Sequence, residues 1–372
     1  MKKRIESVKL MAAAVMMTGV PALGGSGAVE MKMEADALDE SFGGGGSGFW
    51  DRFDLGSYGE LHGRVGDGED NVDLHRLVML GSARITDKLR FVTEVEFEHL
   101  VYDGESGGKS DYEIEIEQAY FEYALRDDLL VNAGIQLVPV GIINLTHEPT
   151  TFQGVERPNV EKYILPSTWW EGAVSVVKTY ESGLQLDVML HTAMDMDSDG
   201  YIRSGRPKLD LNEFTGTESW GVTMRAKYTG ISGVELGAAL QYQDDVSSSV
   251  SGNQETVLAE AHGIYRKGGF ELRALGAYWN VSGFGDSEMR DQWGYYVEPS
   301  YSWETKVGRA GVFARFSHYD YYKSGRNETV EYAVGASYWP MDEVVLKVDY
   351  VNAKLDNDIN DETFNFGLGY YF

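Results

Sequence analysis

The stretch of residues 328–350, ETVEYAVGASYWPMDEVVLKVDY, contains two runs of alternating apolar residues separated by a tight turn. The first run ends on Tyr338-Trp339, and Pro340-Met341-Asp342 forms the turn. In the second run, Val344, Leu346, Val348 and Tyr350 alternate with the polar Lys347 and Asp349. An alternation of period two is typical of a β-strand with one apolar and one polar face. The stretch therefore predicts an antiparallel hairpin.

The same unit, an aromatic residue that closes an alternating run just before a polar turn, occurs six times. The other five are Tyr123 before Arg126-Asp127-Asp128, Tyr180 before Glu181-Ser182-Gly183, Tyr228 before Gly230-Ile231-Ser232-Gly233, Tyr265 before Arg266-Lys267-Gly268-Gly269, and Trp303 before Glu304-Thr305-Lys306. Longer polar loops lie between these turns. A strand ladder with aromatic rings and short turns at one rim is what a bilayer requires of a transmembrane β-barrel.

Counting alternating runs and turn signals predicts about sixteen strands. They lie near 54–64, 75–86, 89–101, 112–124, 129–138, 169–180, 184–192, 218–228, 234–244, 255–266, 270–280, 292–303, 309–320, 328–338, 344–353 and 362–372. The even number fits an all-β, antiparallel barrel of up-and-down topology. A soluble β-sandwich has the same strand pattern, with the apolar face as its core. The alternation of short and long connections and the aromatic rim favour the barrel.

The N-terminus predicts an exported protein. Lys2, Lys3, Arg4 and Lys9 precede an apolar run from Leu10 to Leu23, and small residues follow at 26–28. This order is typical of a secretory signal over residues 1–28. A transmembrane anchor is the alternative, but the run is shorter than the ~20 residues that a span needs. Residues 29–51 include six consecutive small residues at 43–48 and predict a flexible segment before a barrel over 52–372.

Composition excludes several kinds of protein. The formal net charge of −27 argues against nucleic acid as a partner. Cysteine is absent, so neither disulfides nor thiolate metal sites contribute to the fold. Forty-four glycines and 23 tyrosines with only eight prolines suit many strands and few helices.

Two segments that flank a long connection carry a resemblance to a known family. They are VPVGIINL at 138–145 and LPSTWWEG at 165–172, with THEP at 146–149 and GVERP at 154–158 between them. The segment resembles the phosphate-selective porin O and P family, and more closely its uncharacterised porin relatives. The resemblance implies a sixteen-stranded, trimeric, passive channel in the outer membrane of a Gram-negative bacterium, surrounded by lipid bilayer and lipopolysaccharide.

The final residues carry a second resemblance. Tyr371-Phe372 is similar to the C-terminal aromatic signal that the outer-membrane assembly machinery recognises. Phe372 is therefore the expected assembly signal. One departure from the family matters, because nothing here matches the lysine cluster that draws anions into its phosphate-selective members. We expect a weakly selective or cation-preferring channel for small hydrophilic solutes, with an anion- or phosphate-selective porin as the alternative.

The connection 139–168 is too long for a simple hairpin and predicts a functional segment. In trimeric porins the third outer loop, which this would be, folds into the lumen and narrows it. The residues expected to line the constriction are Glu148, Glu156, Arg157, Glu161 and Lys162, and Trp169-Trp170 is expected to anchor the loop at the outer rim. The alternative is an extracellular loop with a solvated surface.

Charged residues on the inward faces predict two opposed walls. The acidic wall comprises Glu94, Glu96, Glu98, Glu113, Glu115 and Glu117, and the basic wall comprises Arg225, Lys227, Arg273 and Arg315. Six carboxylates on neighbouring strands repel one another unless water, cations or arginines accompany them. Opposed walls would create a transverse field in the lumen. The alternative is local pairing, in which Arg84 and Arg90 neutralise the glutamates.

A short acidic motif resembles the first half of a calcium-binding loop. Asp195, Asp197 and Asp199 alternate and are followed by Gly200, which lets oxygen ligands converge on a hard cation. Arg206 stands where the twelfth-position acid belongs, so a solvated acidic loop is the stronger alternative. No other cofactor is expected.

Two other classes of function are weaker alternatives. An enzyme would need a nucleophile beside a base. The seven histidines are scattered over different predicted strands and loops, and no Gly-x-Ser-x-Gly motif occurs. We therefore do not expect an enzyme. An adhesin or structural barrel would need much longer outer loops or a lumen sealed by bulky side chains.

Overall fold

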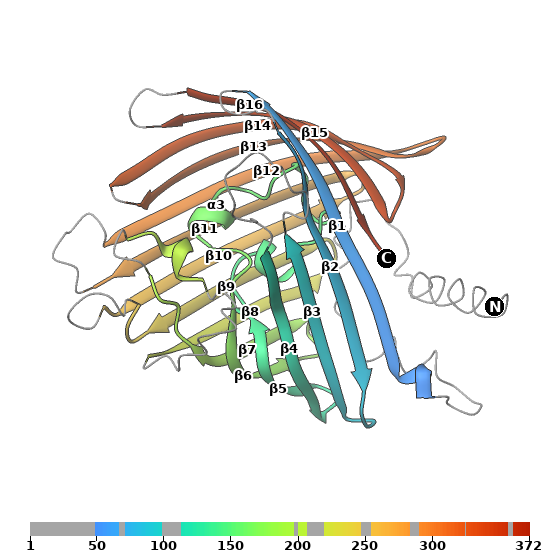
Figure 1. Ribbon diagram of the computed structural model, residues 1–372, viewed down its shortest axis with the longest axis vertical. Coiled ribbons are helices and arrows are strands. Elements are labelled where there is room, and N and C mark those ends of the chain that lie inside the picture. The colour runs from blue at the N-terminus through green and yellow to red at the C-terminus, as the bar shows by residue number, and fades with distance from the viewer. Residues whose placement is uncertain are drawn as a thin grey trace.

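The computed structural model describes residues 49–66, 71–98, 113–196, 200–206, 219–246, 254–282, 290–323, 325–355 and 360–372. The predicted signal, most of the flexible segment, Asp197 and Asp199 lie outside the described residues. Sixteen antiparallel strands pair in sequence order and β16 pairs back to β1, which closes the barrel (Figure 1). The predicted fold is confirmed.

The strands agree with the predicted ranges to within a few residues. They are β1 (Phe53–Gly66), β2 (Asn71–Arg84), β3 (Leu89–Glu98), β4 (Glu113–Arg126), β5 (Leu129–Leu137), β6 (Trp170–Thr179), β7 (Leu184–Thr192), β8 (Trp220–Ile231), β9 (Val234–Gln243), β10 (Thr256–Lys267), β11 (Phe270–Val281), β12 (Asp291–Thr305), β13 (Gly308–Tyr322), β14 (Arg326–Met341), β15 (Val344–Leu355) and β16 (Asn360–Tyr371). Short helical turns are η1 (Phe49–Arg52), η2 (Ile143–Leu145), α3 (Val160–Tyr163) and η3 (Ile202–Gly205).

The tight turns lie at one end of the barrel and the long connections lie at the other. Gly233 makes the two-residue turn between β8 and β9 possible, because its φ of 75° lies in the left-handed region. A Cβ at this position would lie 2.2 Å from the carbonyl oxygen of Arg266. In bacterial barrels the short turns face the periplasm and the longer loops face the outside.

The outer surface is apolar between two aromatic belts. Tyr123, Tyr180, Tyr265 and Trp303 are exposed near the short turns, as predicted. A second set of exposed rings lies toward the long loops: Trp220, Tyr242, Tyr278 and Tyr295. No helix among the described residues is long and apolar enough to cross a membrane.

Three tryptophans differ from the expected rim positions. Trp339 was counted in the aromatic rim, but it is buried, and the Arg309 guanidinium lies 4.0 Å from the centre of its ring. Trp169 is also fully buried, with its ring centre 6.0 Å from that of Trp279. Trp170, the first residue of β6, is 6% exposed, so neither ring of Trp169-Trp170 lies at the outer rim. The prediction was wrong for all three tryptophans. For Trp339 the reason is that adjacent residues on a strand face opposite sides.

The long connection between β5 and β6 folds into the barrel, as predicted. Figure 1 shows α3 and the rest of this connection within the ring of strands. Val140, Ile143, Val160 and Ile164 of the connection are almost fully buried and belong to one hydrophobic cluster with Tyr296 of β12. We call residues 138–169 the inner loop.

Candidate functional site: the inner loop and the barrel wall

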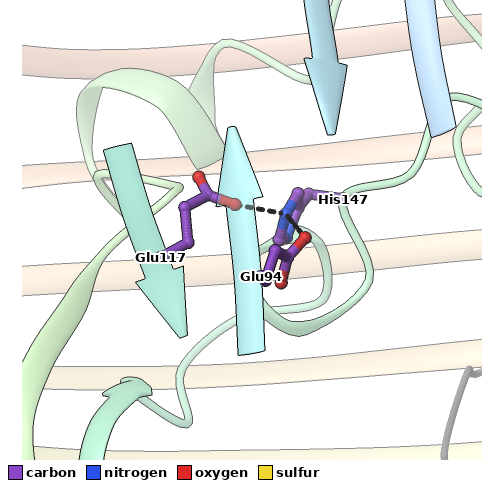
Figure 2. Close-up of side chains that lie close together, drawn as sticks. All are labelled: Glu94, Glu117 and His147. Carbon is purple, nitrogen blue, oxygen red and sulfur yellow. Dashed lines mark hydrogen bonds and ion pairs between the residues drawn. The ribbon is translucent and has the colours of Figure 1, made fainter. Parts of the chain in front are cut away.

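The inner loop first contacts the wall formed by β2, β3 and β4. The Nε2 atom of His147 lies 3.1 Å from Glu117 Oε2 and 3.4 Å from Glu94 Oε1 (Figure 2). Arg76 donates from Nη2 to the His147 carbonyl oxygen at 2.5 Å. Burial alone would lower the pKa of His147, but Glu117 and Glu94 outweigh it and raise this pKa to about 9. These contacts attach the start of the loop to the acidic wall.

The middle of the loop crosses to β15. Lys347 donates from Nζ to the carbonyl oxygens of Phe152, at 2.7 Å, and Gly154, at 2.8 Å. The Val155 backbone N–H donates to Asp349 Oδ2 at 2.6 Å. Buried peptide groups must find partners. Here Lys347 and Asp349, two residues apart on the inner face of β15, satisfy three peptide groups of the loop. They therefore fix the position along the barrel axis at which the loop crosses the lumen.

The return of the loop is organised by Glu161. Its carboxylate accepts hydrogen bonds from the backbone N–H groups of Ile142 and Ile143, at 2.8 and 2.6 Å, and from Tyr296 OH at 2.7 Å. Burial raises the pKa of Glu161, and these donors oppose that shift. Glu161 was expected to line the constriction, but the structure buries it completely, and its carboxylate holds the two ends of the inner loop together.

The other four residues expected at the constriction differ in exposure. Glu156 and Lys162 keep 42% and 35% of their side chains exposed, and their charged atoms lie 3.8 Å apart. Glu156 also contacts His62 Nδ1 of β1 at 2.9 Å. Burial raises the pKa of Glu148, and burial, followed by the charge of Arg76, lowers the pKa of Arg157. Glu156 and Lys162 are therefore the two residues of this set that reach solvent most openly.

The acidic wall is divided into a part that contacts His147 or Arg76 and an outer part toward the long loops. Glu94, Glu96, Glu115 and Glu117 are buried. At the outer ends of the two strands, Glu98 lies opposite Glu113 in register. Among the described residues, no lysine, arginine or histidine lies within 4.0 Å of the carboxylates of Glu98, Glu113 or Glu115. We call these three residues the acidic rim.

Local pairing dominates elsewhere in the lumen. Arg225 Nε lies 2.5 Å from Asp187, Arg273 Nε lies 2.7 Å from Glu271, and Arg315 Nη1 lies 3.1 Å from Glu298. Lys227 is buried. The predicted basic wall therefore presents paired rather than free charges. The alternative assumed that Arg90 neutralises the six glutamates of the acidic wall. Instead, Arg90 pairs with Glu122 at 2.7 Å.

Several wall residues that hold the loop were not predicted as site residues. Arg76 lies between Glu60, at 2.5 Å, and Glu96, at 3.7 Å, and is fully buried. Asn159 of the loop donates to Glu331 of β14. A charged residue at an inward strand position could have been predicted from the sequence as a contact of the loop. Its partner could not, because the partner depends on strand register and on the path of the loop.

The predicted calcium motif lies only partly within the described residues. Asp195 donates its backbone N–H to the Gly205 carbonyl oxygen at 3.2 Å, and Met196 donates to that of Val246 at 2.6 Å. Asp197 and Asp199 lie outside the described residues. Calcium binding at Asp195, Asp197 and Asp199 stays a prediction.

Known proteins share this architecture. A barrel described as an anion-selective porin from Comamonas acidovorans superimposes with a TM-score of 0.59 over 86% of this chain and 99% of that chain, at 11% identity. OmpT of Vibrio cholerae in its trimer form gives 0.55 over 86% and 99%, at 10% identity. The channel DcaP of Acinetobacter baumannii gives 0.56 over 86% and 97%, at 12% identity. These identities establish the fold alone.

Sequence comparison establishes the family. An uncharacterised protein of Aquifex aeolicus (strain VF5) is 27% identical over 347 residues, which cover 82% of this chain and 77% of that protein. Residues 52–365 match the family described as phosphate-selective porin O and P. The family and the fold indicate a channel of the Gram-negative outer membrane rather than an enzyme. The chain belongs to the phosphate-selective porin O and P family.

Proposed function

We propose that this porin is a water-filled passive diffusion channel for small hydrophilic solutes and ions, and that it is weakly selective or prefers cations. The observation that carries the preference is the acidic rim, Glu98, Glu113 and Glu115, at the outer ends of β3 and β4. Charges at the mouth of a narrow passage set the local concentration of ions of each sign. A negative rim with no lysine, arginine or histidine within 4.0 Å among the described residues therefore enriches cations.

The inner loop is the proposed constriction. It contacts β2, β3 and β4 through His147, β15 through Phe152 and Gly154, and β12 through Glu161, so it divides the lumen. The half-exposed pair Glu156 and Lys162 carries one charge of each sign on the loop. In contrast, the paired arginines of the predicted basic wall contribute little net field.

Assembly and surroundings are part of the same proposal. OmpT of Vibrio cholerae, a structural neighbour, has a trimer form, which supports a homotrimer here. Lipid bilayer and lipopolysaccharide would contact the belts of exposed rings. Phe372 is proposed as the signal for the outer-membrane assembly machinery. Its backbone N–H and carbonyl pair with Ser57 of β1, at 2.8 and 2.9 Å, where the barrel closes.

Single-channel recording tests the selectivity. The purified protein is inserted into a planar lipid bilayer with a tenfold gradient of KCl, and the reversal potential is measured. We expect a small reversal potential whose sign shows that K⁺ permeates more readily than Cl⁻. A strong anion preference, or block of chloride current by low concentrations of phosphate, would contradict the proposal and support the anion- or phosphate-selective alternative.

A further inference from the structure

Three side chains from distant parts of the sequence converge inside the barrel. Glu94 comes from β3, Glu117 from β4 and His147 from the inner loop, and Figure 2 shows both carboxylates beside the same edge of the imidazole ring. The ligand atoms of the three lie within 4.8 Å of one another, and all three side chains are buried. Around an ion with bonds of ~2.0–2.1 Å, tetrahedral ligand atoms are about 3.4 Å apart. The distances of 3.1 and 3.4 Å from His147 Nε2 fit that spacing.

Two other histidines in the lumen provide a comparison. His62 also contacts two glutamates, but Glu60 lies at Nε2, at 3.0 Å, and Glu156 lies at Nδ1, at 2.9 Å. His262 contacts Glu260 through Nδ1 and Glu235 through Nε2. Carboxylates on opposite ring nitrogens cannot share one ion with that ring. Within the described part of the chain, Glu94, Glu117 and His147 are the one group of three that converges.

Buried carboxylate oxygens at the group need a positive partner. Glu117 Oε1 and Glu96 Oε1 are buried, and neither accepts a hydrogen bond from the described residues. Glu96 lies opposite Glu115 in register, and Glu117 is two residues further along β4. Arg76 Nη1 lies 3.7 Å from Glu96 Oε1. Two carboxylates that lie close together in a dry environment repel unless a proton or a cation lies beside them.

The surrounding residues orient the group as outer-shell residues orient metal ligands. Tyr58 donates its OH to Glu94 Oε1 at 2.7 Å, and Gln118 donates to the other oxygen of Glu94. The Arg76 guanidinium holds the His147 carbonyl oxygen. The second ring nitrogen of His147 faces the Asn144 carbonyl oxygen at 3.4 Å. These contacts leave Nε2 and one oxygen of each carboxylate directed at a common point.

We propose that Glu94, Glu117 and His147 bind a divalent first-row transition-metal ion, which ties the inner loop to the acidic wall. One imidazole and two carboxylates suit Zn²⁺, Co²⁺ or Fe²⁺, whereas Ca²⁺ and Mg²⁺ prefer oxygen ligands alone. The acidic rim lies on the outer side of the same two strands and offers a path for a cation to enter. Binding is independent of the proposed channel function, because it requires no conduction.

Metal titration of the purified full-length barrel in detergent tests the site. The protein is stripped with EDTA at neutral pH and titrated with Zn²⁺ by calorimetry and with Co²⁺ by visible absorption. We expect one ion per chain and Co²⁺ bands typical of nitrogen and oxygen ligands. A hundredfold excess of Ca²⁺ or Mg²⁺ should not displace Zn²⁺.

Matched variants assign the ligands. His147→Gln and Glu117→Gln should each weaken Zn²⁺ binding at least a hundredfold, and Tyr58→Phe should weaken it about tenfold, as outer-shell changes do. His262→Gln is the control, because it removes a histidine with two glutamate neighbours that do not converge. It should bind as the parent does. Heat-modifiable migration on gels shows which variants are folded.

Two results would overturn the proposal. One is a folded parent barrel that binds no stoichiometric Zn²⁺ or Co²⁺, which would make the group an ion pair between an imidazolium and two carboxylates. The other is equal binding by His262→Gln, His147→Gln and Glu117→Gln. If His147→Gln does not fold, Glu94→Gln and Glu117→Gln, which keep the size and hydrogen-bonding shape of the side chains, decide the question alone.

Discussion

Along β15 the two faces of one strand differ completely. Leu346, Val348 and Tyr350 face outward with 40–43% of their surface exposed, whereas Lys347 and Asp349 face inward and are 4% and 3% exposed. The outer side chains need only be apolar, because lipid offers no specific partner. The inner ones bind particular peptide groups of the inner loop, Lys347 two carbonyls and Asp349 one N–H. The outer surface therefore depends on composition, and the inner surface depends on individual pairs.

This difference predicts that single substitutions matter much more inside the barrel. Removing one partner of a buried pair leaves the other charge uncompensated, which costs about 3–5 kcal/mol. Removing an exposed side chain from the outer surface costs the protein few contacts. The following experiments test that contrast, from the largest expected effect to the smallest.

Arg315→Met should destabilise the barrel most. Arg315 is 4% exposed and lies 3.1 Å from Glu298 and 3.8 Å from Glu331, so its removal leaves two buried carboxylates without their cation. We expect a loss of about 3–5 kcal/mol in the free energy of unfolding. Urea titration followed by gel migration of folded and unfolded barrels measures it.

The control is the triple variant Arg315→Met, Glu298→Gln and Glu331→Gln. It removes the whole charge cluster, so most of the lost stability should return. A single Arg315→Met variant that unfolds at the same urea concentration as the parent would show that these inner charges are not coupled, and the contrast between the two surfaces would fail.

Deleting Thr151 to Glu161 should widen the passage while the strands stay intact. The deletion removes the contacts to Lys347, Asp349 and Tyr296, but leaves His147 on the acidic wall. We expect single-channel conductance to rise several-fold and charge discrimination to fall, because the constriction concentrates the field. Planar-bilayer recording measures both. A deletion variant that forms barrels but conducts and selects as the parent does would place the inner loop outside the ion path.

Neutralising the acidic rim should change selectivity while the barrel stays folded. In the variant Glu98→Gln, Glu113→Gln and Glu115→Gln, we expect the cation-to-anion permeability ratio to fall about two- to threefold, because mouth charges set local ion concentrations. Glu181→Gln, on an exposed short turn at the opposite end, is the matched control and should leave the ratio unchanged. An equal shift in both variants would mean that overall charge, rather than the rim, sets the preference.

The fold could be predicted because each strand of the barrel wall has one face toward lipid and one toward the lumen, so apolar and polar residues alternate. Period-two alternation revealed each of the sixteen strands and placed Lys347 and Asp349 on the inner face. It could not identify their partners. Lys347 binds carbonyl groups that are 195 and 193 residues away in sequence, and no local pattern encodes the path of the inner loop.

The length of the long loop and the family resemblance predicted that it lies in the lumen, but the roles expected of individual residues were partly wrong. Glu161 looked like a pore-lining charge, yet it binds the backbone of Ile142 and Ile143. His147 was counted only among the seven scattered histidines. Its meeting with Glu94 and Glu117 requires both the register of β3 with β4 and the depth of the loop, and the sequence displays neither.

The smallest effect on the folded barrel is expected from removing Phe372. Its side chain is 73% exposed, and its ring centre lies 6.1 Å from that of Tyr370 on the outer surface. A chain that ends at Tyr371 loses one exposed ring and the two backbone hydrogen bonds to Ser57, so the free energy of unfolding should fall by only about 1–2 kcal/mol. If Phe372 is read by the assembly machinery, the amount of barrel in the outer membrane of cells should fall far more than this change in stability explains. Refolding the purified chain in detergent and quantifying the protein in outer-membrane fractions separate the two effects. Normal outer-membrane levels of the shortened chain would show that Phe372 is an ordinary residue of the apolar outer surface.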